Sequence, residues 1–212
     1  MSSFNKCIFY SNGHGSLDLH GNYVTAPAKM HKFKDGTILY EGVKNKEYGD
    51  IAMSKMMDLG INVVSVSHTF EDTKLSHRTN LANFYHSSIQ KGIYLSEHSN
   101  AHNTRAKGFS VWTSPGQTYS DVLATRFFEM YVEEFRQPVE HNKIKFRTQS
   151  YRDRDPDYEA RFWELVQTNM PAVLFENLFF DNRQDAEILM DEGYRDRYTT
   201  LQAKFALWSV TQ

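Results

Sequence analysis

The chain has 212 residues, of which 40% are hydrophobic, 14% are aromatic and 24% are charged, and its formal net charge is −2. A chain of this length can bury a substantial core, and we expect one domain over residues 1–212. Because the charge is balanced and no basic block stands out, nucleic acid is not an expected partner. No apolar run approaches the length of a transmembrane helix, so membrane insertion is not expected either.

The N-terminus shows no secretory signal, because apolar structure begins within a few residues of Met1 and the apolar core of a signal peptide is missing. Three explanations stay open: the protein remains where it is made, it is exported by another route, or a signal has been removed. The single cysteine, Cys7, lies in an apolar run and is expected to be a small core residue.

Strand-like and helical patterns alternate along the chain. Apolar runs predict strands at residues 6–11, 61–66, 92–96, 109–112, 143–147 and 172–175. Helical spacing predicts helices at residues 43–59, 75–90, 120–136, 158–167, 184–190 and 195–210, with Ser120 as the N-cap of the third. Residues 21–36 predict a long loop and residues 150–156 a charged turn. The alternation predicts a single α/β domain with a mostly parallel central sheet, helices on both faces, and an active site at the carboxyl edge of the strands.

Three predicted strands are followed by side chains that bind metals or transfer protons. His14 follows the first strand, His98 follows the strand at 92–96, and Glu176 follows the strand at 172–175. The carboxyl ends of parallel strands lie along one edge of the sheet, so these residues can meet there. Taken alone, Glu176 is more simply a glutamate that reaches solvent where its strand ends. Its convergence with two histidines favours a catalytic acid/base.

Two histidines and a carboxylate are ordinary zinc ligands, and a catalytic zinc takes three protein ligands and leaves one position for water. The third ligand must be another acidic residue. Glu41, at the start of a predicted helix, is the best placed, whereas Glu47 and Asp50 lie deeper along that helix.

Other histidines and acids are weaker candidates. His102 is a second choice beside His98, and Glu97 is expected to point away from His98 because side chains alternate along a strand. The remaining histidines are expected to be ordinary surface or core residues, namely His20, His31, His68, His77, His86 and His141.

Six short motifs occur in a fixed order along most of the chain. They are Asn12-Gly13-His14-Gly15, Glu41 with Asn45, Arg78 with Ala82-Asn83, Ser96-Glu97-His98-Ser99-Asn100-Ala101 followed by Gly108, Ser120 with Leu123-Ala124, and the stretch 171–182. As an ordered set they resemble the motifs of the zinc-dependent N-acetylmuramoyl-L-alanine amidases of the amidase type 3 family. The chain departs from that family at residues 16–20 and carries extra residues before Glu41, which we expect to form part of the substrate cleft.

The resemblance implies that one zinc ion is held by His14, Glu41 and His98, with Glu176 as the general base. The implied substrate and partner is peptidoglycan, and the implied bond is the amide between the lactyl group of N-acetylmuramic acid and L-alanine of the stem peptide. Asn100, two residues past a ligand, either orients His98 or contacts substrate, and a plain turn role is the alternative.

Two rival functions and two settings stay open. A metallocarboxypeptidase-like hydrolase would carry a His-x-x-Glu pair of ligands, which the sequence lacks, and a non-catalytic peptidoglycan-binding protein would not need all four residues. We expect a phage endolysin, made in the bacterial cytoplasm and then admitted to the wall, with no separate cell-wall-binding module. The alternative is a periplasmic enzyme whose signal was removed. The oligomeric state and the stem-peptide preference do not follow from the sequence.

Overall fold

In the computed structural model of the protein, which describes residues 4–25, 29–137, 143–149 and 154–212, a central sheet has the strand order β4-β1-β5-β8-β6-β7. Its strands are β1 (Cys7–Asn12), β4 (Val63–Ser65), β5 (Gly92–Asn100), β6 (Ser110–Thr113), β7 (Tyr158–Glu159) and β8 (Ala172–Phe179). The four strands β4, β1, β5 and β8 are mutually parallel, whereas β6 pairs antiparallel with β8 and the edge strand β7 runs parallel to β6. The predicted α/β fold with a mostly parallel sheet is therefore confirmed.

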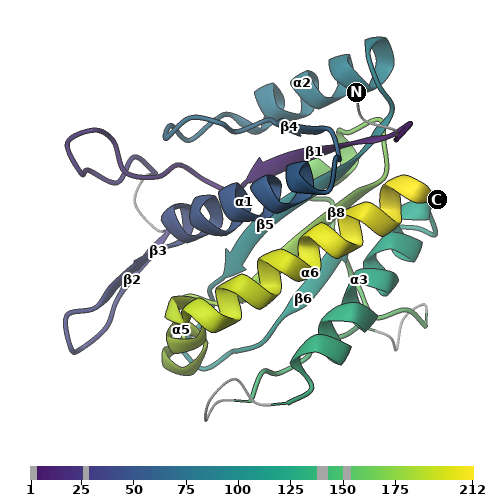
Figure 1. Ribbon diagram of the computed structural model, residues 1–212. Coiled ribbons are helices and arrows are strands. Elements are labelled where there is room, and N and C mark those ends of the chain that lie inside the picture. The colour runs from purple at the N-terminus through teal and green to yellow at the C-terminus, as the bar shows by residue number, and fades with distance from the viewer. Residues whose placement is uncertain (1–3, 26–28, 138–142, 150–153) are drawn as a thin grey trace.

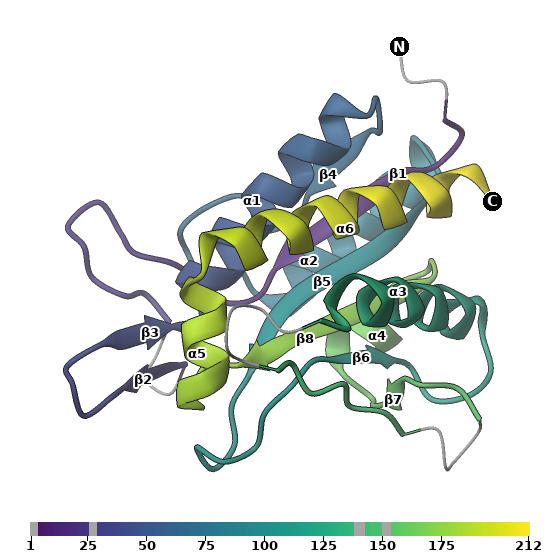
Figure 2. The same ribbon diagram turned by 60° about the horizontal axis from the view of Figure 1, so that its bottom comes forward.

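Helices cover both faces of this sheet (Figures 1 and 2). The helices are α1 (Glu41–Asp58), α2 (Leu75–Ser88), α3 (Tyr119–Phe135), α4 (Trp163–Val166), α5 (Arg183–Met190) and α6 (Glu192–Thr211). The larger part of the core lies between the sheet and α1, α3 and α6, and it is rich in aromatic rings, such as Phe109 stacked on Tyr131 at 3.7 Å. A smaller cluster lies under α2 and α4. Every residue of β1 is buried, as expected for a strand covered on both faces.

Two predicted segments have a different structure. The expected loop at residues 21–36 contains β2 (Met30–Lys32), which pairs antiparallel with β3 (Ile38–Tyr40) in a hairpin that projects beyond the sheet (Figure 1). The expected helix at 158–167 is instead the edge strand β7 followed by the short helix α4. Tyr158 pairs with Trp112 and stacks on its ring at 4.8 Å, and this tertiary contact overrides the local helical pattern.

Smaller corrections concern element ends. Residues 143–147 form no strand, only a single bridge from Phe146 to Phe109. The N-cap of α3 is Thr118, not Ser120, because Thr118 and Asp121 form a reciprocal capping box. The predicted turn at 150–156 lies mostly outside the described residues. Strands β5 and β8 continue past their predicted ends, so His98 and Glu176 lie within the sheet rather than after it.

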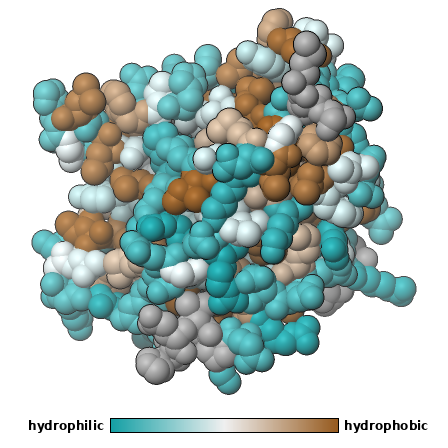
Figure 3. Space-filling view, in the orientation of Figure 1, coloured by the Kyte–Doolittle hydropathy of each residue, from teal (hydrophilic) through white to brown (hydrophobic). Residues whose placement is uncertain are grey.

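The surface view gives the distribution of apolar side chains. Over the middle of this face the surface is mainly hydrophilic, and hydrophobic side chains gather on the left, where the loop after β1 and the β2–β3 hairpin project, and again at the upper right (Figure 3). Exposed hydrophobic residues of these two segments are Leu17, Leu19 and Ile38. Among the described residues no helix has the length and apolarity needed to cross a membrane.

Candidate metal centre

The structure brings His14, Glu41 and His98 together at one edge of the sheet. Glu41 Oε1 lies 3.3 Å from His14 Nε2 and 3.1 Å from His98 Nδ1. The two imidazole rings stand edge to face with centroids 5.1 Å apart. Their ligand atoms and the Glu41 carboxylate all lie within 4.8 Å of one another. This is the trio that the sequence pattern predicted.

Glycines on both sides of His14 allow this approach. His14 follows the end of β1 at Asn12 and has a positive φ of 64°, so the backbone turns sharply at this residue. A Cβ atom added to Gly13 would lie 2.3 Å from Cε1 of His98, so the His98 ring occupies the space above that glycine. Gly15 N donates to Thr25 Oγ1 at 2.7 Å and fixes the other side of the turn.

Glu41 is the first residue of α1 and is almost completely buried. Its backbone N donates to Lys29 O, and its Oε1 accepts from Asn45 Nδ2 at 3.4 Å one helical turn later. Asn45 also donates to Gly13 O at 3.0 Å, which joins α1 to the loop that carries His14. Burial opposes ionisation, but hydrogen bonds and charge from His14 and His98 hold the pKa of Glu41 well below its usual range.

The donor set fits a zinc ion. Four buried atoms around the cluster have no hydrogen-bond partner among the described residues: His14 Nε2, Glu41 Oε2, His98 Nε2 and Glu176 Oε2. Buried polar atoms are rarely left without a partner, so their concentration here indicates a ligand-binding site. Two imidazoles and one carboxylate form a common ligand set of catalytic zinc. His14, Glu41 and His98 would hold the ion.

Glu176 lies beside the trio without belonging to it. It pairs with His98 across β5 and β8, and all four residues line one hollow of about 490 Å³. Burial raises the pKa of Glu176 to about 7. A carboxyl group with that pKa can both accept and release a proton near neutral pH.

Other candidates lie elsewhere. Glu47 pairs with Lys44 and Arg195 on the surface of α1, and Asp50 bonds to Asn12 and Lys46. Neither reaches the trio.

Glu97 points to the opposite face of β5, as predicted, where Asn177, Tyr198 and Gln202 donate to its carboxylate. His102 lines a neighbouring hollow, and Asn100 lines both that hollow and the one that the trio shares; neither belongs to the trio. His141 lies outside the described residues.

The sequence did not predict a buried network of hydrogen bonds and ion pairs beside the trio. Glu164, on α4, lies with its Oε2 3.6 Å from His98 Nε2. Burial opposes ionisation, but His98 and Arg78 lower the pKa of Glu164 to about 2. Arg78 is itself almost fully buried and donates to Ser11 Oγ at 3.0 Å and Asn12 O at 2.7 Å. The only sequence signal was an acidic residue inside the otherwise apolar run from Phe162 to Val166.

The trio lies in a groove that continues to one side. A hollow of about 340 Å³ adjoins the first one, and the two share Asn100, Ala101, Phe162 and Glu176. Leu75, Phe162 and Trp163 line the first hollow and are 44%, 39% and 46% exposed. The groove therefore combines a polar floor with an apolar wall.

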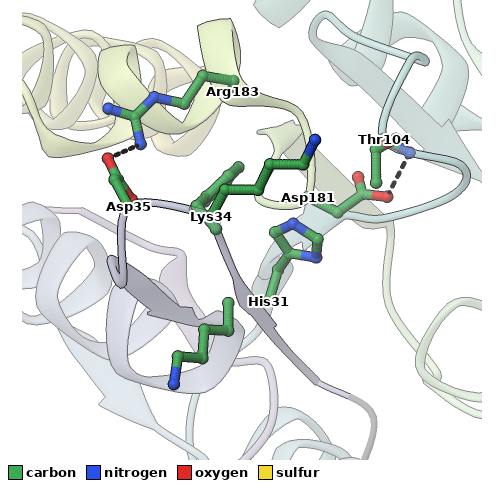
Figure 4. A pocket seen from close by; sticks show the side chains of 8 residues that line it. His31, Lys34, Asp35, Thr104, Asp181 and Arg183 are labelled. Atoms are coloured by element: carbon green, nitrogen blue, oxygen red, sulfur yellow. Dashed lines mark hydrogen bonds and ion pairs between the residues drawn. The ribbon is translucent and has the colours of Figure 1, made fainter.

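The projecting hairpin forms a separate hollow of about 620 Å³ (Figure 4). Arg183 on α5 binds Asp35 at 2.6 Å and ties the hairpin to the body of the protein. Across this hollow, Thr104 N donates to Asp181 Oδ2 at 2.9 Å. None of the four candidate site residues lines it. Among the described residues of the insertion, Lys29, which precedes the hairpin, reaches the candidate metal centre, where its Nζ lies 3.5 Å from Glu41 Oε2.

A parallel α/β sheet that holds two histidines and a glutamate at its carboxyl edge, beside a second glutamate, is typical of metal-dependent hydrolases. Residues 11–205 match the model of the amidase type 3 family, described as N-acetylmuramoyl-L-alanine amidase. The chain belongs to this family.

Individual relatives agree with this assignment. The chain is 29% identical over 193 residues to the N-acetylmuramoyl-L-alanine amidase CwlM of Bacillus licheniformis, covering 88% of this chain and 62% of that protein. It is 24% identical over 190 residues to the endolysin of Bacillus phage SPP1, covering 89% and 60%. The chain thus spans about three fifths of these relatives. An N-acetylmuramoyl-L-alanine amidase from Clostridium difficile 630 has the same fold, with a TM-score of 0.77, 22% identity and 99% of both chains covered.

Proposed function

We propose that the protein is a zinc-dependent N-acetylmuramoyl-L-alanine amidase that hydrolyses the amide between N-acetylmuramic acid and L-alanine in peptidoglycan. The observation that carries the proposal is the meeting of His14, Glu41 and His98 with Glu176 in one hollow of a chain that belongs to this family. The named relatives, an amidase and an endolysin, support the same substrate.

Each residue has a defined role in this proposal. His14, Glu41 and His98 hold zinc, which when bound supplies a Lewis acid for the scissile carbonyl and for water. Glu176 accepts the proton of the attacking water and later delivers it to the leaving nitrogen of L-alanine. Its place inside β8 fixes the carboxylate on a rigid element beside the metal ligands.

The groove gives the substrate room on one side of the metal centre. Asn100 ends β5 and lines both hollows, so we assign it to substrate contact. Its backbone O accepts from Phe180 N at 2.9 Å, which fixes the strand end while the side chain stays available. The exposed aromatic rings of Phe162 and Trp163 give the groove a wall on which a sugar or peptide can pack.

Glu176→Gln tests the assignment of the base. The variant should keep its fold and its zinc, but release of free L-alanine amino groups from purified sacculi should fall by roughly 100- to 10,000-fold, the usual range for a lost general base. A variant that digested sacculi at nearly the wild-type rate would show that Glu176 is not the base.

His98→Ala tests the ligand assignment separately. Zinc content measured on the purified variant should fall well below one ion per chain, because only two protein ligands would remain. Undiminished metal content would contradict the assignment. Mass spectrometry of muropeptides with and without a chelator would identify the bond and show whether its hydrolysis needs the metal.

The biological setting forms part of the proposal. We propose an endolysin that is made in the bacterial cytoplasm and then acts on the wall, and the relative from Bacillus phage SPP1 supports this. The relative from Bacillus licheniformis supports the alternative, an enzyme that acts in the wall of its own bacterium. Fractionation of the cell that naturally makes the protein would distinguish the two, because an endolysin stays in the cytoplasm until the inner membrane is permeabilised, whereas the alternative enzyme reaches the wall without permeabilisation.

A further inference from the structure

We propose that Glu164 is a positioning residue that orients His98 for metal binding. The inference rests on the proposed zinc site and extends it to a residue outside the ligand trio. Glu164 lines the same hollow as the trio and Glu176, and of these four residues it lies beside His98, with Oε2 3.6 Å from Nε2. Its hydrogen bonds go to Ser11, Tyr94 and Ser96 and not to Glu176, so we assign its role to an effect on His98.

Glu164 is a fixed, buried carboxylate. Its side chain is 3% exposed, although it lies on a helix of only four residues. Oε1 accepts from Ser11 Oγ and Tyr94 Oη, both at 2.6 Å, and Oε2 accepts from Ser96 Oγ at 3.2 Å. Arg78 Nη1 lies 3.9 Å from Oε1 and supplies a balancing charge. A carboxylate that is buried at such cost and supported by three hydroxyl groups is held in one orientation.

In this orientation the Glu164 carboxylate faces the His98 ring. The Nδ1 atom of His98 faces Glu41, whereas Nε2 is buried without a hydrogen-bond partner and lies 3.6 Å from Glu164 Oε2. A small rotation of the ring closes this distance to a hydrogen bond. With its proton on Nε2, directed at Glu164, the imidazole presents an unprotonated Nδ1 toward the metal site. A carboxylate behind a ligating histidine commonly fixes the tautomer in this way.

The second histidine has a similar but weaker arrangement. His14 faces Glu41 through Nε2, and its Nδ1 lies 3.9 Å from Asp72 Oδ2. Arg78 joins the two arrangements, because its Nη2 lies 3.4 Å from Asp72 Oδ1. Asp72 is 38% exposed, so solvent screens its charge, whereas that of Glu164 is not screened. The stronger effect is therefore assigned to Glu164.

Glu164→Gln isolates this role. The glutamine has nearly the same volume, and its oxygen can still accept from Ser11 and Tyr94. Its NH₂ group then faces His98 Nε2 and favours the tautomer that carries the proton on Nδ1, the atom turned toward the metal site. To bind zinc, His98 must then lose the proton on Nδ1 and take up the less favoured tautomer, which carries its proton on Nε2.

The measurement is the zinc affinity of the metal-free, full-length protein, determined by competition with a chromophoric chelator. We expect Glu164→Gln to bind zinc about 10- to 100-fold more weakly than wild type, the usual cost of losing such a partner. Glu97→Gln is the matched control, because Glu97 is equally buried, accepts three hydrogen bonds and neighbours His98 on β5, but points to the opposite face. Its zinc affinity should stay within about threefold of wild type, which is less than the loss expected at position 164.

A purely structural role predicts a different pattern. It would lower the melting temperature of the metal-free protein equally for both variants and leave both zinc affinities unchanged, and this result would overturn the proposal. Glu164→Asp keeps the charge and should recover part of the affinity. If Glu164→Gln does not fold, Glu164→Asp replaces it as the test variant. Its carboxylate is one methylene farther from His98, so a zinc affinity equal to that of wild type would also contradict the proposed role. If the wild-type protein bound no zinc, the proposed zinc site itself would be wrong. The same measurement therefore separates a failure of the zinc site from a failure of the role assigned to Glu164.

Discussion

At the scale of single residues, the proposed metal centre depends on a glycine as well as on its three proposed ligands. Gly13 donates its N–H to Glu97 O at 2.8 Å and leaves the space above it to the His98 ring. Gly13→Ala places a methyl group where ring atoms already lie, so His98 must move away from Glu41. We expect the rate of peptidoglycan hydrolysis to fall on the order of 100-fold, as for other displacements of about 1 Å in a catalytic site.

The control for this change is Gly193→Ala at the start of α6. The nearest atom to the added Cβ there is Asp191 Oδ1, at 3.2 Å. That variant should keep wild-type activity. Equal activity of the two alanine variants, measured on the same sacculi, would show that the His98 ring does not need the space above Gly13.

For single residues, the sequence could predict which side chains of the candidate site come together, but not every residue that supports them. That His14, Glu41, His98 and Glu176 come together was predictable, because each stands next to a strong element signal, such as the glycines around His14 or the apolar run before Glu176. Glu164 was not, because the tertiary partners that make it significant, Ser11, Tyr94 and Arg78, come from three other parts of the chain. No local pattern marks a residue whose role depends on such contacts.

At the scale of elements, Asn182 is the N-cap of α5. Its Oδ1 accepts from Gln184 N at 3.0 Å and Asp185 N at 3.3 Å, and its Nδ2 donates to Thr104 O at 3.1 Å. Asn182→Ala should lower the free energy of unfolding by about 1–2 kcal/mol, because it removes the cap of a helix. Urea unfolding measures this directly. Asn80→Ala, at an exposed position within α2, is the control and should cause no loss. Equal stability of the two variants would contradict the capping role.

Asp185 connects three elements and gives stability a dependence on pH. Its Oδ2 accepts from Gly108 N at 2.7 Å and Phe179 N at 2.9 Å, which ties α5 to β8 and to the loop after β5. Burial raises the pKa of Asp185 from 3.8 to about 6. A raised pKa in the folded state means that its stabilising contribution is complete below about pH 4 and is lost as the pH rises through 6.

Asp185→Asn has no proton to lose and therefore gains stability relative to wild type as the pH rises. The difference in unfolding free energy between the two proteins should change in favour of the variant by about 2–3 kcal/mol between pH 4 and pH 7. Urea unfolding at both pH values measures it. A difference that was the same at both pH values would show that the carboxyl group does not titrate across this range.

Elements were predictable where one local pattern dominates. The apolar residues Leu123, Phe127 and Tyr131 of α3 are buried at their helical spacing, and the helix has nearly its predicted bounds. The hairpin of β2 and β3 was missed because Met30–Lys32 is short and only partly buried, so no alternation marks it. The edge strand β7 has two residues, and its pairing with β6 is visible only in three dimensions.

At the scale of the whole molecule, the candidate metal centre exists only when the three central strands β1, β5 and β8 have paired and α1 has packed beside them. Its four residues come from the loop after β1, from α1, from β5 and from β8, and the strands meet because β1 and β8 both pair with β5. An unfolded chain cannot hold these groups together. Zinc binding should therefore be coupled to the global stability of the fold rather than to one loop.

Removing the metal is accordingly expected to destabilise the whole protein. With free zinc at 100 times its dissociation constant, binding to the folded state adds about 2.7 kcal/mol. For a chain of this size that corresponds to an increase in melting temperature of roughly 5–10 °C. Calorimetry of the protein with excess zinc and with a chelator measures the difference. His14→Ala is the control, because the loss of one of three ligands should remove most of the zinc response while the rest of the sheet stays intact. If the variant and the wild type responded equally to zinc, the ion would bind elsewhere and the coupling through this site would be wrong.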